Sequence, residues 1–242
     1  MKQSTVVAEL LDHSVSVIIP VFNEVTTIEY VVEKVLAESV TSEVIIVDDA
    51  STDGTSSVLE ALSMSDSRIQ LVHQKRNCGK GAAIRRGMEL VRSSLVVIQD
   101  ADMEYDPQDI PKMVQPIVDG EADVVFGTRC NNGSFSGCKP IQAAANRMLT
   151  YLTNTTLGLC LSDMETGFKA FPASICKSLD LRENRFGIEP ELTAKFAKLG
   201  LRIKEVPVTY SGRSYADGKK IGWRDGLWAI LCIARYSLTR RA

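Results

Sequence analysis

The sequence has no long hydrophobic run and no leader-like N-terminus, and these absences exclude several classes of protein. Its longest apolar stretch covers residues 226–234, whereas about 20 apolar residues are needed to span a bilayer as a helix. The first 12 residues lack the apolar core of a signal peptide and carry Glu9 and Asp12. We therefore expect a soluble or peripheral protein inside the cell, that is, a cytoplasmic one.

Paired cysteines and basic excess are lacking as well. The six cysteines are scattered, and no two have the Cys-x-x-Cys spacing of a zinc or redox site. We interpret them as reduced thiols of a cytosolic protein. A formal net charge of −2 argues against a nucleic-acid-binding protein, which normally carries a strong basic excess. With 45% hydrophobic and 24% charged residues, the composition is that of an ordinary globular protein with one core.

Short apolar runs that alternate with helical patterns predict the fold class. The predicted strands are rich in β-branched residues and cover Val15–Val21, Val44–Val47, Ile69–His73, Leu95–Ile98 and Val124–Thr128. They are continuously apolar, which is typical of parallel strands covered on both faces. Apolar residues recur at helical spacing from Ile28 to Leu36 and predict a helix between the first two strands. The alternation indicates an α/β fold with a mostly parallel sheet flanked by helices.

The pattern changes from about Cys130 onward, where we expect a C-terminal elaboration of the same domain. We predict helices over residues 141–157, 189–199 and 223–238, a strand over 203–210, and a further segment around 168–171. The expected division is an N-terminal extension over 1–14, a single domain over 15–220 and an amphipathic C-terminal helix over 221–242. That helix carries tryptophan and arginine, so it either lies at a membrane interface or packs on the core or across a dimer.

Segments with polar residues stand at the carboxyl ends of three of the predicted strands. The candidate residues in these segments are Pro20, Phe22 and Glu24, then Asp48, Asp49 and Ser51, then Gln99, Asp100, Ala101 and Asp102. In an open α/β sheet, ligands bind beyond the carboxyl ends of the strands. The carboxylates of Asp100 and Asp102 are two residues apart and can share one hard divalent cation, which commonly keeps substrate phosphates in its shell.

A glycine-rich turn precedes the helix that follows the third strand. Backbone N–H groups around Gly79 and the side chain of Lys80 can meet a phosphate there, and a turn that merely allows close packing is the alternative. The turn is not a P-loop, because Gln74 and Gly81 replace the first glycine and the hydroxyl residue of that motif. No G-x-G-x-x-G follows the first strand, which excludes the dinucleotide-binding fingerprint.

Taken together and in order, these segments resemble a known family. VSVIIPVFNE, VDDASTDGT, GKGAAIRRG, QDADMEYDP and FGTR are similar to the motifs of family-2 glycosyltransferases with a GT-A fold. In the second half, DMETGFKAF, FGIEPELTAK and EVPVTYSGRSYADGKKIGWRDG resemble the dolichol- and polyprenyl-phosphate mannose or glucose synthases. The resemblance runs from about residue 15 to residue 224 and is more specific for the family than for this branch.

The resemblance implies roles on the donor side. Asp100 and Asp102 would ligate Mg²⁺ or Mn²⁺ across the diphosphate of a nucleotide sugar, either GDP-mannose or a UDP-hexose. The nucleotide would be held by Pro20, Phe22, Glu24, Asp48, Asp49, Ser51, Gly79, Lys80, Gln99 and Ala101 together with these two carboxylates. A metal neutralises the charge that develops on the leaving diphosphate. The sugar and the base stay open.

On the acceptor side the resemblance implies a polyprenyl phosphate, met at the membrane surface. An anionic phosphate is already a nucleophile and needs cations rather than a general base. The candidate cations are Arg129, Arg147, Arg213, Lys219 and Lys220, with Lys139 as a rival to Arg147. By the resemblance, Asp163 stands where other family-2 enzymes place their base. The candidate catalytic residues are therefore Asp163, the cation Arg129 and the two metal ligands Asp100 and Asp102.

Two alternatives compete with inverting transfer of a hexose to a polyprenyl phosphate. In the first, an enzyme of the same fold glycosylates a soluble or protein hydroxyl, with Asp163 or Glu165 as base. In the second, the chain is a non-catalytic nucleotide-binding module, against which the intact pair Asp100 and Asp102 argues. The chain could form a homo-oligomer under any of these three interpretations.

Overall fold

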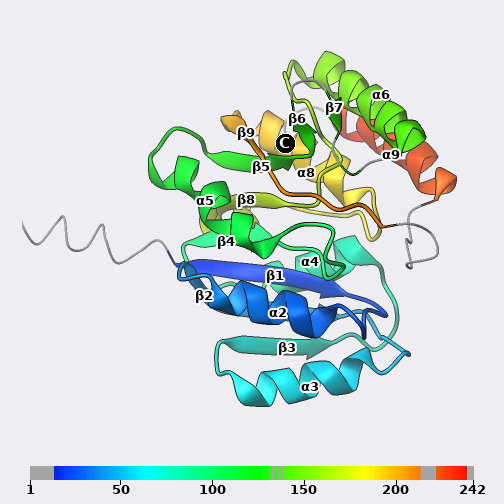
Figure 1. The fold of residues 1–242 in the computed structure, drawn as a ribbon. Helices are drawn as coiled ribbons and strands as arrows, with labels where there is room; N and C mark the ends of the chain where they lie inside the picture. Colours follow the sequence, from blue (N-terminus) through cyan, green and yellow to red (C-terminus); the bar gives the residue numbers. More distant parts are fainter. Residues whose placement is uncertain (1–13, 132–133, 136, 138, 214–221, 239–242) are drawn as a thin grey trace, which may run out of the picture.

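The computed structural model describes residues 14–131, 134–135, 137, 139–213 and 222–238 (Figure 1). Strands and helices alternate regularly as far as β5. These elements are β1 (Val15–Val21), α2 (Ile28–Ala37), β2 (Thr41–Asp48), α3 (Thr55–Ser65), β3 (Ile69–His73), α4 (Lys80–Met88), β4 (Leu95–Ile98), the 3₁₀ turn η1 (Pro107–Asp109), α5 (Ile110–Val118) and β5 (Val124–Thr128). The later elements are β6 (Cys130–Asn131), β7 (Ser134–Phe135), α6 (Pro140–Leu157), β8 (Lys169–Pro172), α7 (Ala173–Cys176), α8 (Ile188–Lys198), β9 (Ile203–Pro207) and α9 (Trp223–Leu238).

Within the described residues, seven strands form one sheet in the order β3-β2-β1-β4-β8-β5-β9. The neighbours β3, β2, β1 and β4 are parallel, and β9 is parallel to β5. The strand β8 is antiparallel to both β4 and β5. Because the first four strands are parallel, the loops after β1, β2 and β4 meet at the same edge of the sheet. The predicted fold class is confirmed.

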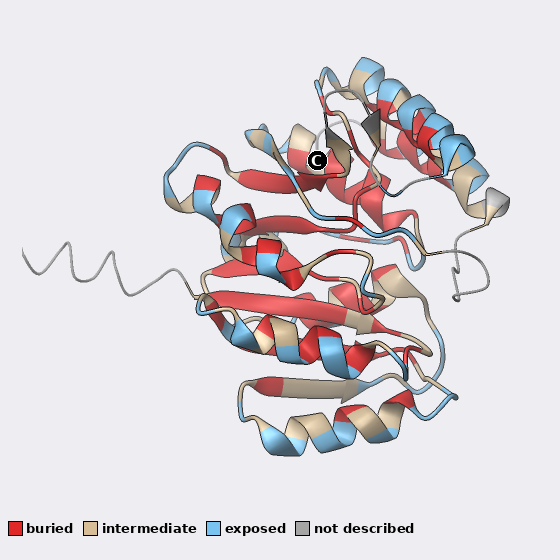
Figure 2. Cartoon of the chain, in the orientation of Figure 1, coloured by how far each residue is buried: buried red, intermediate tan, exposed pale blue. Residues whose placement is uncertain are grey.

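Helices cover both faces of the sheet and create two apolar layers. Side chains along β1 alternate, so that Val17 and Ile19 join the layer with α2 and α5, while Ile18 joins the layer with α4 and α8. Ile18 packs so closely on α4 that a Cβ at Gly87 would lie 2.5 Å from its Cγ2. Figure 2 shows the central strands buried along their length, with exposed residues on the outward sides of the helices.

The helices α6 and α8 begin one residue earlier than predicted, at Pro140 and Ile188. Two strand boundaries differ by three residues, each for a local reason. β2 begins at Thr41, because the polar Glu43 is accommodated in the strand by a 2.6 Å hydrogen bond from Ser16 Oγ. β9 ends at Pro207, after which Thr209 donates to Asp109 and Tyr210 bridges to Tyr105. Residues 169–172 form the antiparallel strand β8.

The C-terminal helix α9 covers Trp223–Leu238, as predicted, and packs against α6 and α8. In the described part of the chain, every helix is too short or too polar to cross a membrane. The proposed domain limits at 14/15 and 220/221 stay predictions, since residues 1–13 and 214–221 lie outside the described residues.

Candidate active site

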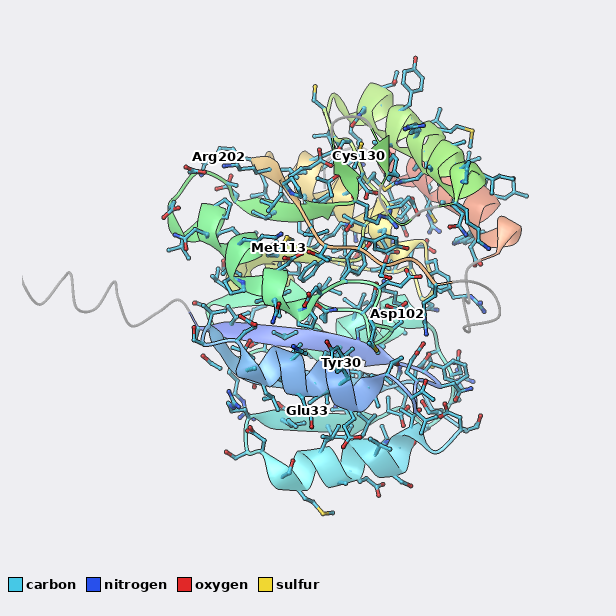
Figure 3. All side chains as sticks on the ribbon, in the orientation of Figure 1. Tyr30, Glu33, Asp102, Met113, Cys130 and Arg202 are labelled. Carbon is cyan, nitrogen blue, oxygen red and sulfur yellow. The ribbon has the colours of Figure 1, made fainter. Side chains whose placement is uncertain are left out.

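A cavity of about 1010 Å³ opens at the carboxyl edge of the sheet and continues between the C-terminal helices. At its polar end it is lined by the carboxylates of Glu24, Asp49, Asp100 and Asp102. Figure 3 shows Asp102 at this edge and Arg202 at the opposite edge. The other end lies between α6 and α9 and is lined by apolar side chains: Ile141, Ala145, Met148, Leu149, Leu227 and Ile230.

The loops that carry the carboxylates are bent by residues in the left-handed region. Asn23, Ala50 and Met103 follow β1, β2 and β4 and have φ angles of 51°, 62° and 59°. Such backbone costs on the order of 1 kcal/mol for a residue with a Cβ and persists where the surroundings hold it. The Asn23 N–H donates to Ser51 Oγ at 2.9 Å, and Asn23 Oδ1 accepts from the Thr52 N–H at 2.7 Å. The loops after β1 and β2 therefore support each other.

The neighbouring carboxylates of Asp48 and Asp49 have different surroundings. Asp49 lines the cavity, and its oxygens accept from the N–H groups of Cys78 and Gly79 at 2.7 Å each. Burial, which those hydrogen bonds partly offset, raises the pKa of Asp49. Asp48 is buried behind it and accepts from Ser56 Oγ at 2.6 Å. Burial alone would raise the pKa of Asp48, but hydrogen bonds from Ser51 and Ser56 hold it below its ordinary value.

Arg213 lies among the carboxylates at the polar end. Its Nη1 and Nη2 are 2.9 and 3.0 Å from the two carboxylate oxygens of Glu24, and Nη2 is 3.1 Å from Asp102 Oδ2. The Arg213 N–H also donates to Glu104 at 2.8 Å. Burial, followed by the charges of Asp100 and Glu104, raises the pKa of Asp102 to about 7. This end of the cavity therefore favours a cation, and the guanidinium supplies one.

Lys80 begins α4 and joins two carboxylates from distant parts of the chain. Its Nζ is 2.7 Å from Asp100 Oδ1 and 2.9 Å from Glu189 Oε1. Burial works against the charge of Lys80, but the two carboxylates outweigh it and raise its pKa above the ordinary value. Lys80, Asp100 and Glu189 line the cavity together.

The glycines around Lys80 allow a second segment to approach. A Cβ at Gly79 would overlap the carbonyl oxygen of Asn184, and a Cβ at Gly81 would overlap that of Glu183. Gly79 also has φ 96°, a conformation that residues with a Cβ rarely adopt. Close packing of the turn on residues 183–184 thus accounts for both glycines, while a phosphate-binding role stays a prediction.

Arg129 follows β5 and lines the cavity beside Tyr210. Its Nε and Nη2 each lie 2.7 Å from an oxygen of Asp163, and Asn146 Nδ2 donates to the same carboxylate at 2.7 Å. Asp163 is 0% exposed and does not line the cavity. Burial opposes its charge, yet the Arg129 guanidinium holds the pKa of Asp163 below its ordinary value.

The structure brings most of the predicted donor residues together and separates some others. Pro20, Phe22, Glu24, Asp49, Gly79, Lys80, Asp100, Ala101 and Asp102 line one cavity with Arg129 and Arg213. Ser51, Asp48 and Gln99 support the loops from behind; Gln99 is fully buried and donates to the carbonyl oxygens of Asp100 and Tyr105. Arg147 is exposed, lies over the ring of Phe135 and does not line the cavity. Lys219 and Lys220 lie outside the described residues.

Sequence reasoning gave no role to several residues that the fold adds to the cavity. Glu104, Tyr210 and Glu189 all line it, and Glu165 received only an alternative role as a base. Glu189 carried no distinctive signal, because acidic residues are favoured in the first turn of a helix whether or not they have a partner. The partner itself, Lys80, is more than 100 positions earlier in the chain.

The α/β sheet with acidic loops at its carboxyl edge, and a cavity leading away from them, is the arrangement expected of a GT-A fold. Residues 16–179 match the family described as glycosyl transferase family 2. The chain belongs to this family and is a glycosyltransferase, which confirms the family and the enzyme class expected from its motifs.

Two curated relatives show the range of similar proteins. The chain is 28% identical over 235 residues to undecaprenyl-phosphate mannosyltransferase of Micrococcus luteus, which covers 93% of this chain and 94% of that protein. It is 31% identical over 211 residues to dodecaprenyl-phosphate galacturonate synthase of Rhizobium johnstonii, covering 84% of this chain and 61% of that longer protein.

Among solved structures, the fold is similar to glucosyl-3-phosphoglycerate synthase from Mycobacterium tuberculosis in complex with Mn²⁺, UDP and glucosyl-3-phosphoglycerate. The TM-score is 0.72 at 22% identity, and the match covers 95% of this chain and 82% of that one. At this identity the likeness supports the shared fold alone.

Proposed function

We propose that the protein transfers a hexose, with inversion, from a nucleotide diphosphate sugar to a polyprenyl phosphate at the cytoplasmic surface of a membrane. The observation that carries the proposal is a continuous cavity with a carboxylate-rich end and an apolar end. The polar end suits a metal–nucleotide complex, and the apolar end between α6 and α9 suits a prenyl chain. The names of the Micrococcus luteus and Rhizobium johnstonii relatives support the same acceptor class.

The donor end has the ligands for a divalent cation. Asp102 and Asp100 present carboxylates at the cavity wall, and Mg²⁺ or Mn²⁺ prefers oxygen ligands completed by substrate phosphates. Among the residues that the structure describes, no group of three or more histidine, cysteine or acidic side chains is arranged to hold a metal. We propose that the cation is held by the two carboxylates and the diphosphate together. When bound, it would act as a Lewis acid toward the leaving group.

The chain's own residues then place the two substrates. Asp49 and Glu24 would contact the nucleoside, which enters beside β1 and β2. Arg129 would hold the acceptor phosphate, whose oxygen attacks the anomeric carbon while the nucleoside diphosphate leaves with the bonding electrons. The nucleophile is an anion, so this reaction needs no general base.

The burial of Asp163 supports a phosphate acceptor over a hydroxyl acceptor. In the rival reaction Asp163 would have to take a proton from the acceptor, which requires hydrogen-bond reach into the cavity. Its carboxylate is fully buried and is engaged by Arg129 and Asn146. We infer that it orients Arg129 toward the cavity, and it is therefore a positioning residue.

Exposed apolar residues on α6 and α9 support a membrane as the place of reaction. Ile141 and Tyr151 on α6 are 78% and 68% exposed, and Leu227 and Leu231 on α9 are 54% and 59% exposed. The two helices lie side by side (Figure 1). Ile141 and Leu227 also line the cavity, so the apolar surface continues into it. A prenyl chain could pass from the bilayer into the site without crossing water.

The proposal is tested with purified protein, Mn²⁺ and a short prenyl phosphate. GDP-mannose, UDP-glucose and UDP-N-acetylglucosamine are offered in turn, and the product's anomeric configuration is read by NMR. We expect a prenyl-phosphate sugar of inverted configuration from at least one of these donors. Transfer to a soluble hydroxyl acceptor but never to prenyl phosphate would favour the rival, and binding of nucleotide without any turnover would favour the non-catalytic module.

A further inference from the structure

The basic side chains that line the cavity differ in whether an acidic residue pairs with them. Among the described residues these side chains are Lys80, Arg129, Arg185 and Arg213. Lys80, Arg129 and Arg213 each have a nitrogen within 3.1 Å of a carboxylate oxygen. Arg185 is exposed, and within the part of the chain that the structure describes its side chain has neither an ion pair nor a hydrogen bond. Its charge is therefore available to a ligand, whereas the other three are already paired.

The segment that carries Arg185 is fixed against the glycine-rich turn before α4. The carbonyl oxygen of Asn184 accepts from the Ala82 N–H at 3.1 Å, and Arg85 Nη2 donates to Asn184 Oδ1 at 2.5 Å. The aliphatic part of Arg185 packs on the turn itself, because a Cβ at Gly79 would lie 2.9 Å from Arg185 Cγ. The backbone and the stem of this arginine are thus held in place at the cavity wall.

The same segment is held by the C-terminal helix. Glu183, two residues before Arg185, is buried and accepts from Trp228 Nε1 of α9 at 2.8 Å. Leu227 and Ile230 of this helix line the apolar end of the cavity. Arg185 therefore belongs to the wall that joins the glycine-rich turn to the apolar end.

The proposed reaction brings two anions into the cavity, the donor's diphosphate and the acceptor's phosphate, and a divalent cation neutralises the first. The second has fewer described cations than the sequence predicts, because Arg213 contacts acidic residues and Arg147 does not line the cavity. Arg129 has two of its three guanidinium nitrogens on Asp163. An unpaired guanidinium can bind two oxygens of one phosphate at once, which makes Arg185 suited to this anion.

We propose that Arg185 binds the phosphate of the prenyl phosphate acceptor, whose chain lies in the apolar end beside α9. This inference rests on the proposed function and adds to it a phosphate contact that the sequence motifs did not predict. The arginine distinguishes a prenyl phosphate from the corresponding prenyl alcohol. It contributes little to binding of the donor nucleotide.

The test separates the acceptor from the donor. Arg185→Met keeps an unbranched stem on Gly79 and removes the charge. With Mn²⁺ and the preferred nucleotide sugar, we expect this variant to lower kcat/KM for a short prenyl phosphate by about tenfold to a hundredfold, as for a lost charge-assisted hydrogen bond. Calorimetry with Mn²⁺ should give an affinity for the nucleoside diphosphate within about twofold of the wild type. Arg185→Lys should recover part of the loss, because it restores the charge without the planar fork.

A binding measurement adds a readout that does not depend on turnover. The wild type should bind the short prenyl phosphate more tightly than the prenyl alcohol of the same length, and Arg185→Met should narrow that difference. Arg185→Gln, which also removes the charge, should behave like Arg185→Met and gives the same decision should the methionine variant not fold.

Arg182→Met is the matched control. Arg182 is on the same segment and its side chain is also exposed, but it pairs with Asp180 at 2.6 Å and does not line the cavity. We expect this variant to keep the acceptor kcat/KM and the nucleotide affinity of the wild type.

The outcomes distinguish this inference from the proposed function. If Arg185→Met weakens the nucleoside diphosphate as much as the prenyl phosphate, the arginine serves the donor's phosphates, and the acceptor assignment is refuted. If neither changes while the wild type transfers sugar to prenyl phosphate, Arg185 is a solvated residue of the wall, and the inference alone fails. If the wild type transfers no sugar to prenyl phosphate, the proposed function fails and the inference fails with it.

Discussion

The donor side and the acceptor side of the cavity are assembled in different ways. On the donor side, Glu24, Asp49 and Asp102 sit on loops that directly follow the parallel strands β1, β2 and β4. On the acceptor side, the wall comes from α6, the loop before β8, α8 and α9, and its polar groups are held by partners far away in sequence. Strand order brings the first set to one edge of the sheet, whereas the second set comes together only through long-range pairs such as Arg129 with Asp163.

Loss of the Asp102 carboxylate should have the largest effect, because it removes a proposed ligand of the cation at the donor end. We expect Asp102→Asn to lower transfer by about 10³-fold or more, the scale of a lost electrostatic group at a reacting centre. Turnover is measured over a Mn²⁺ titration, and circular dichroism confirms the fold. Asp106→Asn, on the same loop but at the start of η1, serves as control. Activity near that of the wild type with a chelator present would contradict a metal-dependent donor side.

On the acceptor side, we predict that the ion pair between Arg129 and Asp163 contributes to the stability of the protein. Asp163→Asn leaves a buried guanidinium without its counter-charge, and we expect about 3–5 kcal/mol loss in the free energy of unfolding at pH 7. Urea denaturation measures it. The exposed pair of Asp123 and Arg202 gives the control, since Asp123→Asn should cost about 0–1 kcal/mol.

The same pair predicts a dependence on pH. The pKa of Asp163 is lower in the folded state than in the unfolded chain, despite burial, because Arg129 favours the charged form. Its stabilisation is therefore complete above the unfolded pKa of about 4 and is lost as the pH falls through the lower folded pKa. The wild type should lose stability steeply below about pH 4, and Asp163→Asn should lose less there. If Asp163→Asn keeps the stability of the wild type but no longer transfers sugar to a hydroxyl acceptor, the rival function with Asp163 as general base is supported instead.

The apolar surface on α6 and α9 should affect membrane binding and leave nucleotide binding unchanged. We expect Leu231→Glu to reduce liposome flotation by about tenfold, since burial of a leucine side chain contributes about 1.5–3 kcal/mol. Met64→Glu is the control, because Met64 is 86% exposed on α3 at the other end of the sheet. If both variants float with liposomes to the same extent, the membrane contact does not involve Leu231 on α9.

Replacement of Arg213 should have the smallest effect, a change in Mn²⁺ affinity. It tests whether Arg213 belongs to the donor side or to the acceptor side of the cavity. Its guanidinium contacts Glu24 and Asp102, although the sequence predicts it to bind the acceptor. Without nucleotide it should compete with a divalent cation, so Arg213→Met should bind Mn²⁺ about threefold to tenfold more tightly. Mn²⁺ binding is followed by electron paramagnetic resonance, with Arg202→Met at the opposite edge as control. Weaker Mn²⁺ binding in Arg213→Met would mean that Arg213 assists the cation.

Much of the fold and of the donor site could be predicted because both depend on local patterns. Continuous apolar runs marked the strands, and the acidic residues directly after them marked the edge where ligands bind. Local patterns could not predict which of the adjacent residues Asp48 and Asp49 lines the cavity. A strand end turns consecutive side chains in different directions, and only the packed loops show that Asp49 faces the cavity while Asp48 is held by Ser51 and Ser56.

By itself, the sequence determined the mostly parallel sheet, the family and the position of Asp100 and Asp102 at the sheet edge. These features depend on β-branched runs and the residues that end them, which act over a few positions. Only the tertiary structure decided that Lys80 joins Asp100 to Glu189, that Asp163 is engaged by Arg129, and that Arg147 does not line the cavity. The physical reason is burial. A charged side chain in the interior must find an opposite charge or a hydrogen-bond partner, and the chain brings that partner from any distance in sequence.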